Sequence, residues 1–249
     1  MRIAALYDIH GNLPALEAVL AEIAREDVDQ IVFGGDVVFG PMPRETLERI
    51  GTLGTPKAFI SGNCDRAMLE ILDGRTPTAV PAMVHPLIRW TGEQLTAPEI
   101  AAIRRWPPTW RQTGADGDVL FVHATPRNDT EIFLKTTDEA RLAPIFAATS
   151  AALVLCGHTH MPFDRTIGGV RVVNAGSVGM SFAGPGACWA LIDGVSVELR
   201  RTAYDLPAAA ARVRASGYPQ AEEFATGYVL SSPAEEVTLA RYQPAELKS

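Results

Sequence analysis

Five short apolar segments of this chain each end in a polar motif with an aspartate, an asparagine or a histidine. These motifs are Asp8-Ile9-His10, Gly35-Asp36, Gly62-Asn63, His123 and Gly157-His158-Thr159-His160, and they hold four of the five histidines. Where strands and helices alternate, the carboxyl ends of the strands meet at one edge of a sheet, which is where α/β proteins bind ligands. The pattern therefore favours an α/β fold with a polar site at the strand ends.

The N-terminal third of the chain predicts the alternating strands and helices of a parallel sheet. Strands are predicted over residues 2–8, 30–34 and 57–61, and helices over residues 13–25, 44–51 and 66–72. Asn12 is the predicted N-cap of the first helix, and Pro14 lies in its first turn.

The rest of the chain predicts a second sheet and two helical additions. Residues 76–110 read as a helical excursion beside the mouth of the site, and residues 203–249 as a C-terminal helical cover. Strands are predicted over 119–122, 153–155, 165–167, 170–173, 187–192 and 195–201. Short turns between the later strands favour antiparallel hairpins and hence a mixed second sheet. Since the chain has no repeat or low-complexity linker, residues 1–249 are predicted to form a single domain.

Composition excludes several classes of partner. The net charge is −7, and the chain has no basic run, so neither an extended nucleic-acid groove nor an anionic membrane surface is expected. The N-terminus reaches Asp8 too soon for a signal peptide, and no apolar run is long enough for a membrane span. Three cysteines without metal-site or disulfide spacing favour a reducing compartment, so we expect a cytoplasmic protein.

The five motifs supply oxygen and imidazole ligands in the proportion that divalent metal ions need. One Asp-x-His alone proves little, because an N-cap aspartate beside a loop histidine is common. Recurrence of the same arrangement at five strand ends indicates a metal site instead. The candidate ligands are Asp8, His10, Asp36, Asn63, His123, His158 and His160.

In this order, the motifs Asp-x-His, Gly-Asp, Gly-Asn-x-Asp, His and Gly-His-x-His resemble the calcineurin-like metallophosphoesterase superfamily, from Asp8 to His160. Residues 8–16 and 35–41 are similar to its small bacterial and archaeal phosphodiesterase-like branch, and so is Asn174-Ala175-Gly176-Ser177. The resemblance implies a four-layer αββα sandwich, in which helices flank two mixed sheets.

The resemblance also implies two divalent ions and a role for each ligand. Asp8, His10, Asp36 and His160 would hold one ion, and Asp36 would bridge to a second ion completed by Asn63, His123 and His158. A hydroxide bridging the two ions would attack phosphorus. Manganese is the expected assay metal, and iron, zinc or nickel also suit this ligand set.

One position departs from the common pattern of the superfamily. Many members have a histidine after Gly-Asn, where its charge contacts phosphate, whereas this chain has Cys64 followed by the usual Asp65. A thiol with a reference pKa of about 8.5 is neutral at pH 7. Loss of the positive charge favours monoanionic diesters over dianionic monoesters as substrates. Simple packing of Cys64 is an equal alternative to a direct role.

Residue roles follow from the same resemblance and from position. The predicted catalytic residues are Asp36, Asn63, Cys64, Asp65 and His123, and the predicted substrate-binding residues are Asn12, Asn63 and Arg127. Helix capping is the main role expected of Asn12, and a solvent-facing loop is an equal alternative for Arg127. Trp90, Trp106 and Trp110 are expected in the core rather than against a nucleobase.

These observations predict a two-metal phosphodiesterase that acts on a phosphoester, with a nucleotide-like substrate as one option. Within enzymes, the alternative is a phosphomonoesterase, a protein phosphatase or a dinucleoside polyphosphate hydrolase. A non-catalytic scaffold of the same fold is the alternative from another class, and the intact ligand set counts against it. Sequence pattern does not predict the natural substrate or the oligomeric state.

Overall fold

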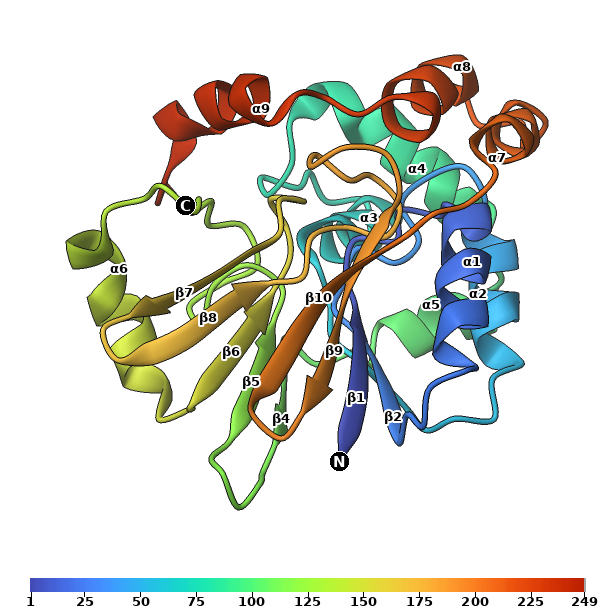
Figure 1. The fold of residues 1–249 in the computed structure, drawn as a ribbon. Coiled ribbons are helices and arrows are strands. Elements are labelled where there is room, and N and C mark those ends of the chain that lie inside the picture. Colours follow the sequence, from blue (N-terminus) through green and yellow to red (C-terminus); the bar gives the residue numbers. More distant parts are fainter. Residues whose placement is uncertain (249) are drawn as a thin grey trace.

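Two five-stranded sheets lie face to face in the computed structural model, which describes residues 1–248 (Figure 1). The first sheet has the order β10-β9-β1-β2-β3. Its strands are β1 (Arg2–Leu6), β2 (Gln30–Phe33), β3 (Lys57–Phe59), β9 (Ala187–Asp193) and β10 (Ser196–Thr202). β1, β2 and β3 run parallel, whereas β9 is antiparallel to both β1 and β10.

The second sheet has the order β4-β5-β6-β8-β7. Its strands are β4 (Thr109–Gln112), β5 (Val119–Val122), β6 (Leu153–Cys156), β7 (Phe163–Ile167) and β8 (Val170–Asn174). The three inner strands are parallel, and the edge strands β4 and β7 pair antiparallel to their neighbours. Both sheets are therefore mixed, and the predicted α/β sandwich is confirmed.

Two details of the prediction are corrected. The hairpin β9-β10 was expected in the second sheet, but it lies in the first sheet beside β1. Its turn specifies an antiparallel hairpin and carries no information about which buried strand edge the hairpin will pair with. The excursion predicted over residues 76–110 is helical up to Ile103, but Thr109 and Trp110 already belong to β4.

Alternation along β1 explains the layers. Ile3 and Ala5 point into the core between the two sheets, whereas Ala4 and Leu6 face the helices on the other side. Those helices are α1 (Leu13–Ile23), α2 (Pro43–Gly51), α3 (Asn63–Leu72), α4 (His85–Glu93) and α5 (Ala97–Ile103). On the outer face of the second sheet, α6 (Glu139–Phe146) packs against residues of β5 and β6.

The C-terminal segment crosses the edge of the sandwich where β1 and β2 end (Figure 1). It contains α7 (Leu206–Arg214), α8 (Ala221–Phe224), the π-helical η3 (Ala225–Leu230) and α9 (Glu235–Tyr242). Short 3₁₀ turns are η1 (Ala82–Val84), η2 (Ala147–Thr149) and η4 (Gln243–Ala245). Within residues 1–248, no helix combines the length and the apolar character needed to cross a membrane.

Candidate metal centre

The loops that follow the strands hold the predicted ligands in an uncommon backbone conformation. Asp8, His10, Asp36, His158 and His160 all have positive φ values, between 48° and 66°. A non-glycine residue in this left-handed region costs about 1–3 kcal/mol, so such residues persist only where the surroundings hold them, and they cluster at functional sites. Neighbouring loops supply that support: the His10 N–H donates to the Asp36 carbonyl at 2.9 Å.

His10 and His160 face each other in a way that suits a cation bound between them. Their Nδ1 atoms lie 3.0 Å from the Phe39 carbonyl and 2.9 Å from the Met180 carbonyl, so each Nδ1 carries the hydrogen that it donates. In the neutral rings, each Nε2 atom therefore carries a lone pair and no hydrogen, and the two Nε2 atoms lie only 3.2 Å apart. A bound ion or a proton relieves the repulsion between them.

Asp8 completes this first group. Its Oδ1 is buried without a hydrogen-bond partner among the described residues. It lies 3.3 Å from His160 Nε2, 3.9 Å from His10 Nε2 and 3.8 Å from His123 Nε2. A buried carboxylate oxygen without a donor is costly, and a metal ion would satisfy it. The donor atoms thus fit a divalent cation.

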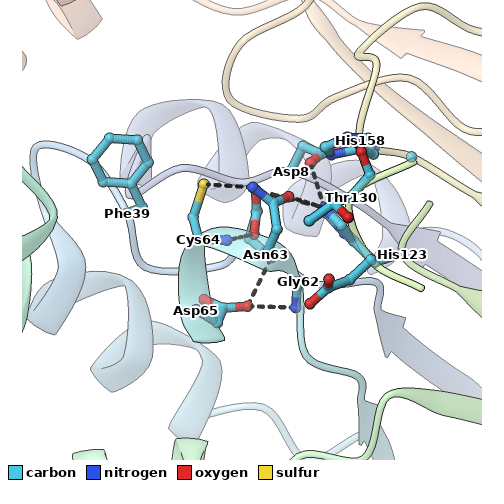
Figure 2. A network of polar contacts seen from close by, with 12 residues as sticks. Asp8, Phe39, Gly62, Asn63, Cys64, Asp65, His123, Thr130 and His158 are labelled. Atoms are coloured by element: carbon cyan, nitrogen blue, oxygen red, sulfur yellow. Dashed lines mark hydrogen bonds and ion pairs between the residues drawn. The ribbon is translucent and has the colours of Figure 1, made fainter. Parts of the chain in front are cut away.

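Asp36 and His123 form a second group that also includes Asp8, and Asn63 lies beside His123 (Figure 2). His123 Nδ1 lies 2.9 Å from the Gly34 carbonyl, which leaves Nε2 directed into the site. That Nε2 is 3.6 Å from Asp36 Oδ2 and 3.0 Å from Asn63 Oδ1. Asp36 Oδ2 also lies 3.8 Å from His10 Nε2, so Asp36 stands between the two groups.

His158 lies beside the second group rather than within it. Its ring centroid is 5.2 Å from that of His123, and its Nε2 lies 3.2 Å from the Thr130 carbonyl. Its backbone N–H donates to Asp8 Oδ2 at 2.8 Å. The other ring nitrogen, Nδ1, remains for an ion. The assignment of each ligand to a particular ion stays a prediction.

Asp65 acts on the loop that carries Asp36. Its carboxylate accepts hydrogen bonds from the backbone N–H groups of Asp36 at 2.8 Å, Val37 at 3.3 Å and Gly62 at 3.1 Å. The Cys64 N–H in turn donates to Asp36 Oδ1 at 2.8 Å. These contacts make Asp65 a residue that positions Asp36, because its oxygens are engaged by the backbone.

Burial and charge separate the protonation states of the histidines. Burial, together with the nearby His160, lowers the pKa of His10 to about 4, and burial with His123 lowers that of His158 to about 4. For His123, burial is outweighed by the Asp36 and Asp8 carboxylates, which raise its pKa to about 10. Ion binding on the His123 side must therefore displace a proton.

Burial and the Asp36 carboxylate raise the pKa of the Cys64 thiol well above its ordinary value. The same two causes raise the pKa of Asp65 to about 7. Asn63 Nδ2 donates to Cys64 Sγ at 3.5 Å. The thiol is thus neutral near pH 7, and it provides neither a nucleophilic thiolate nor a positive charge.

The two other predicted substrate-binding residues have protein partners. Asn12 is fully buried; its Oδ1 caps α1 through Ala15 N–H at 3.3 Å, and its Nδ2 donates to the Gly179 carbonyl at 2.9 Å. These contacts agree with the helix cap expected of Asn12, which also holds the loop of Gly179, and a role in substrate binding stays a prediction. Arg127 is ion-paired with Glu131 and is half-exposed at a cavity wall.

Two cavities border the centre on different sides. The first has a volume of about 470 Å³ and reaches His123; Arg66, Arg104, Arg127 and Trp106 are among its lining residues. The second has a volume of about 310 Å³ and is bordered by Phe39 and Met180, whose carbonyls hold His10 and His160. Figure 2 shows Phe39 on the Cys64 side of the polar network, away from His123 and His158.

Sequence reasoning missed the groups that orient the ligands. The carbonyls of Gly34, Phe39, Thr130 and Met180 fix the histidine rings, and backbone groups leave no mark on a sequence pattern. Three aromatic residues of the second cavity, Tyr218, Phe224 and Tyr228, were also missed, because the C-terminal segment was read only as a cover. The loop motif at Ser177 was noticed, and its hydroxyl donates to the Asp8 carbonyl at 2.7 Å.

A two-sheet α/β sandwich with carboxylates and imidazoles at its strand ends is an arrangement that can hold divalent metal ions. The calcineurin-like phosphoesterase superfamily domain matches residues 1–196, and the chain belongs to this family. It is 25% identical to protein MJ0912 of Methanocaldococcus jannaschii over 242 residues, covering 88% of this chain and 94% of that protein. It is 24% identical to the phosphodiesterase YfcE of Escherichia coli K12 over 204 residues, covering 78% of this chain and 88% of YfcE.

A solved metallophosphoesterase from Sphaerobacter thermophilus has the same fold. Its TM-score is 0.71 at 29% identity, with 91% of this chain and 97% of that chain covered. The family match and the named homologue together support a hydrolase that acts on phosphoesters. The regions shared with MJ0912 and with the Sphaerobacter thermophilus protein cover 88% and 91% of this chain, which is more than the 196 residues matched by the family domain.

Proposed function

We propose that this chain is a phosphodiesterase that uses two divalent metal ions. The observation that carries the proposal is a pair of ligand groups that share Asp8, whose Oδ1 has no hydrogen-bond partner among the described residues. Asp36 Oδ2 lies 3.8 Å from His10 Nε2 and 3.6 Å from His123 Nε2, so it also reaches both groups. When bound, the ions would neutralise phosphate charge and lower the pKa of a water molecule, which makes a nucleophile at neutral pH.

The chain's own residues would bind the two ions and orient the ligand side chains. Asp8, His10 and His160 would hold one ion, and Asn63, His123 and His158 the other, with Asp36 shared between them. The carbonyls behind His10, His123 and His160 fix which ring nitrogen faces the site. Manganese is the metal we propose for assays.

Charge at the site favours a diester over a monoester. Cys64 is neutral, so the position that is a histidine in many relatives adds no cation. The arginines of the larger cavity are already paired with carboxylates: Arg66 with Asp129, Arg104 with Asp73 and Arg127 with Glu131. A monoester dianion therefore gains less here than in a site with an unpaired cation, whereas a diester carries only one negative charge.

The three cysteines of the chain are all free and buried, which supports our expectation of a reducing, cytoplasmic environment. The name of the homologue YfcE, a phosphodiesterase, supports the choice of diesters.

Two chromogenic substrates test the proposal. Protein loaded with manganese is assayed on bis(p-nitrophenyl) phosphate and on p-nitrophenyl phosphate, which share a leaving group. We expect kcat/KM for the diester to exceed that for the monoester. A monoester preference would overturn the choice of diesters, and no hydrolysis of either substrate with any of manganese, iron, zinc or nickel would count against an enzyme.

A further inference from the structure

The smaller cavity beside the metal centre has walls that are mostly apolar and include four aromatic rings. Its volume is about 310 Å³, at the lower end of the range of about 300–1,000 Å³ typical of small-molecule sites. Residues that face it include Phe39, Leu87, Met180, Tyr218, Phe224 and Tyr228. A cavity of this size fits one ring system rather than a polymer.

The walls of this cavity touch the metal centre directly. The ring of Phe39 meets the ring of His10 edge-on, with centroids 5.7 Å apart. The carbonyls of Phe39 and Met180 are the groups that orient His10 and His160. The cavity is therefore separated from His10 and His160 by a single layer of residues, namely Phe39 and Met180.

Ring geometry in the cavity suits an aromatic guest. Tyr218 and Phe224 meet at 86° with centroids 6.1 Å apart, and Phe224 and Tyr228 meet at 62° with centroids 5.5 Å apart. Rings in edge-to-face arrangements present both faces and edges to a further ring, which is the arrangement that aromatic groups prefer.

Charge in the cavity excludes a second anionic group. Among the described residues that line it, none is lysine or arginine, and Glu223 is the one charged side chain. The larger cavity on the His123 side, by contrast, is lined by three arginines. A neutral ring therefore belongs on the Phe39 side.

Much of the cavity wall lies outside the family domain. Tyr218, Phe224 and Tyr228 belong to the C-terminal segment, whereas the family match ends at residue 196. The segment predicted as a surface cover thus adds a wall to the site, and this addition would distinguish the chain from shorter relatives with the same ligands.

We propose that this aromatic cavity is a substrate subsite that binds a neutral aromatic group, such as an aryl ring or a nucleobase, attached to the phosphorus held at the metal centre. The inference rests on the proposed function and names its substrate class: phosphodiesters with at least one aromatic substituent.

Binding of two inert anions tests the subsite apart from catalysis. Methylphenylphosphinate and dimethylphosphinate are both monoanions without an ester bond, and they differ by one ring. Calorimetric titration of the manganese-loaded protein should give at least about tenfold tighter binding of the phenyl compound, since burial of a ring contributes about 1.5–3 kcal/mol and 1.4 kcal/mol is tenfold. Equal affinities would overturn the proposal.

A pair of adjacent substitutions adds a matched control. Val84 lines the cavity and is partly buried, whereas its neighbour Met83 is 81% exposed and does not line it. Val84→Trp should fill the cavity and bring the affinity ratio of the two probes close to one, and Met83→Trp should keep the wild-type ratio. An unchanged ratio in a folded Val84→Trp protein would refute this placement of the ring.

The outcomes also separate the two proposals. If Val84→Trp fails to fold by circular dichroism, the wild-type ratio of the two probes still decides the matter. A phenyl preference in a protein that hydrolyses no diester would retain the subsite and refute the phosphodiesterase. Diester hydrolysis without a phenyl preference would retain the phosphodiesterase and refute the aromatic subsite.

Discussion

The two cavities that flank the metal centre differ in charge and in origin. The larger one adjoins His123 and is lined by arginines that already hold carboxylates. The smaller one adjoins the carbonyls that hold His10 and His160, and its walls are mostly apolar, with four aromatic rings. A phosphodiester has two substituents on one phosphorus atom, and a centre between two unlike cavities can tell them apart.

The difference between the sides extends to protonation. The pKa of His123 lies near 10 because of Asp36 and Asp8, despite its burial, while that of His10 lies near 4 mainly because it is buried. One side of the centre is therefore ready for a cation at neutral pH, and the other must first lose a proton. Asp36 is the residue that both sides share.

Removal of the shared ligand should give the largest effect. Asp36→Asn takes a negative charge from both groups, so we expect kcat for a diester to fall by on the order of 10³-fold, the equivalent of several kcal/mol of lost metal catalysis. Steady-state kinetics at saturating manganese would measure it. Asp116→Asn, an exposed change outside the site, serves as the control. Full activity of Asp36→Asn would contradict the proposal that Asp36 is a ligand shared by the two ions.

Metal titration at several pH values should reveal the asymmetry of the two sides. Below pH 10 His123 carries a proton that an ion must displace, so affinity on that side should rise about tenfold per pH unit between pH 6 and 9. His10, with a pKa of about 4, is already neutral and should release none.

Calorimetry in two buffers with different ionisation enthalpies would count the protons. We expect the unmodified chain to release about one proton more than His123→Asn when both ions bind, since a proton lost by metal-bound water is common to both proteins. Equal proton release by the unmodified chain and by His123→Asn would show that the two sides do not differ in the protonation of their histidines.

Truncation of an arginine in the larger cavity should have a modest effect. Arg127 is half-exposed and already paired with Glu131, so Arg127→Ala should raise KM for a diester by no more than about fivefold, which corresponds to about 1 kcal/mol. Arg105→Ala removes an exposed arginine that does not line the cavity and is the matched control. A rise in KM far above tenfold would indicate that Arg127 contacts the phosphate of the substrate directly.

The smallest effect is expected from Cys64→Ser. The thiol is neutral and lies on the Phe39 side of the polar network (Figure 2), and serine keeps a small neutral group there. We expect diester hydrolysis to stay within about threefold of the unmodified rate, because no thiolate takes part. A loss above tenfold would favour a direct role for the thiol over packing.

The sequence predicted the ligand positions better than the surroundings of the ligands. Asp8, Asp36 and His123 each follow an apolar strand, and that local pattern is enough to place each of them at the carboxyl end of a strand. The pattern did not predict that His123 comes from the second sheet and the two aspartates from the first. The partner of β1 and the role of the C-terminal helices depend on contacts between distant segments. β9 pairs with β1 although some 180 residues separate them, and no turn or periodicity in either segment specifies that pairing.

Roles that depend on orientation were also beyond the sequence. Asn12 fits a helix cap by its position before Leu13, but its second contact, with the Gly179 carbonyl, comes from a loop far along the chain. Asp65 was predicted as catalytic, and only the structure places its oxygens against three backbone N–H groups. Side-chain direction is decided by packing, which a motif does not encode.

Anomalous diffraction from crystals grown with manganese would test the central claim most directly. We predict two peaks about 3.5–4 Å apart, one among Asp8, His10 and His160 and one among Asn63, His123 and His158, with Asp36 between them. A single peak, or peaks away from these residues, would contradict a two-metal centre.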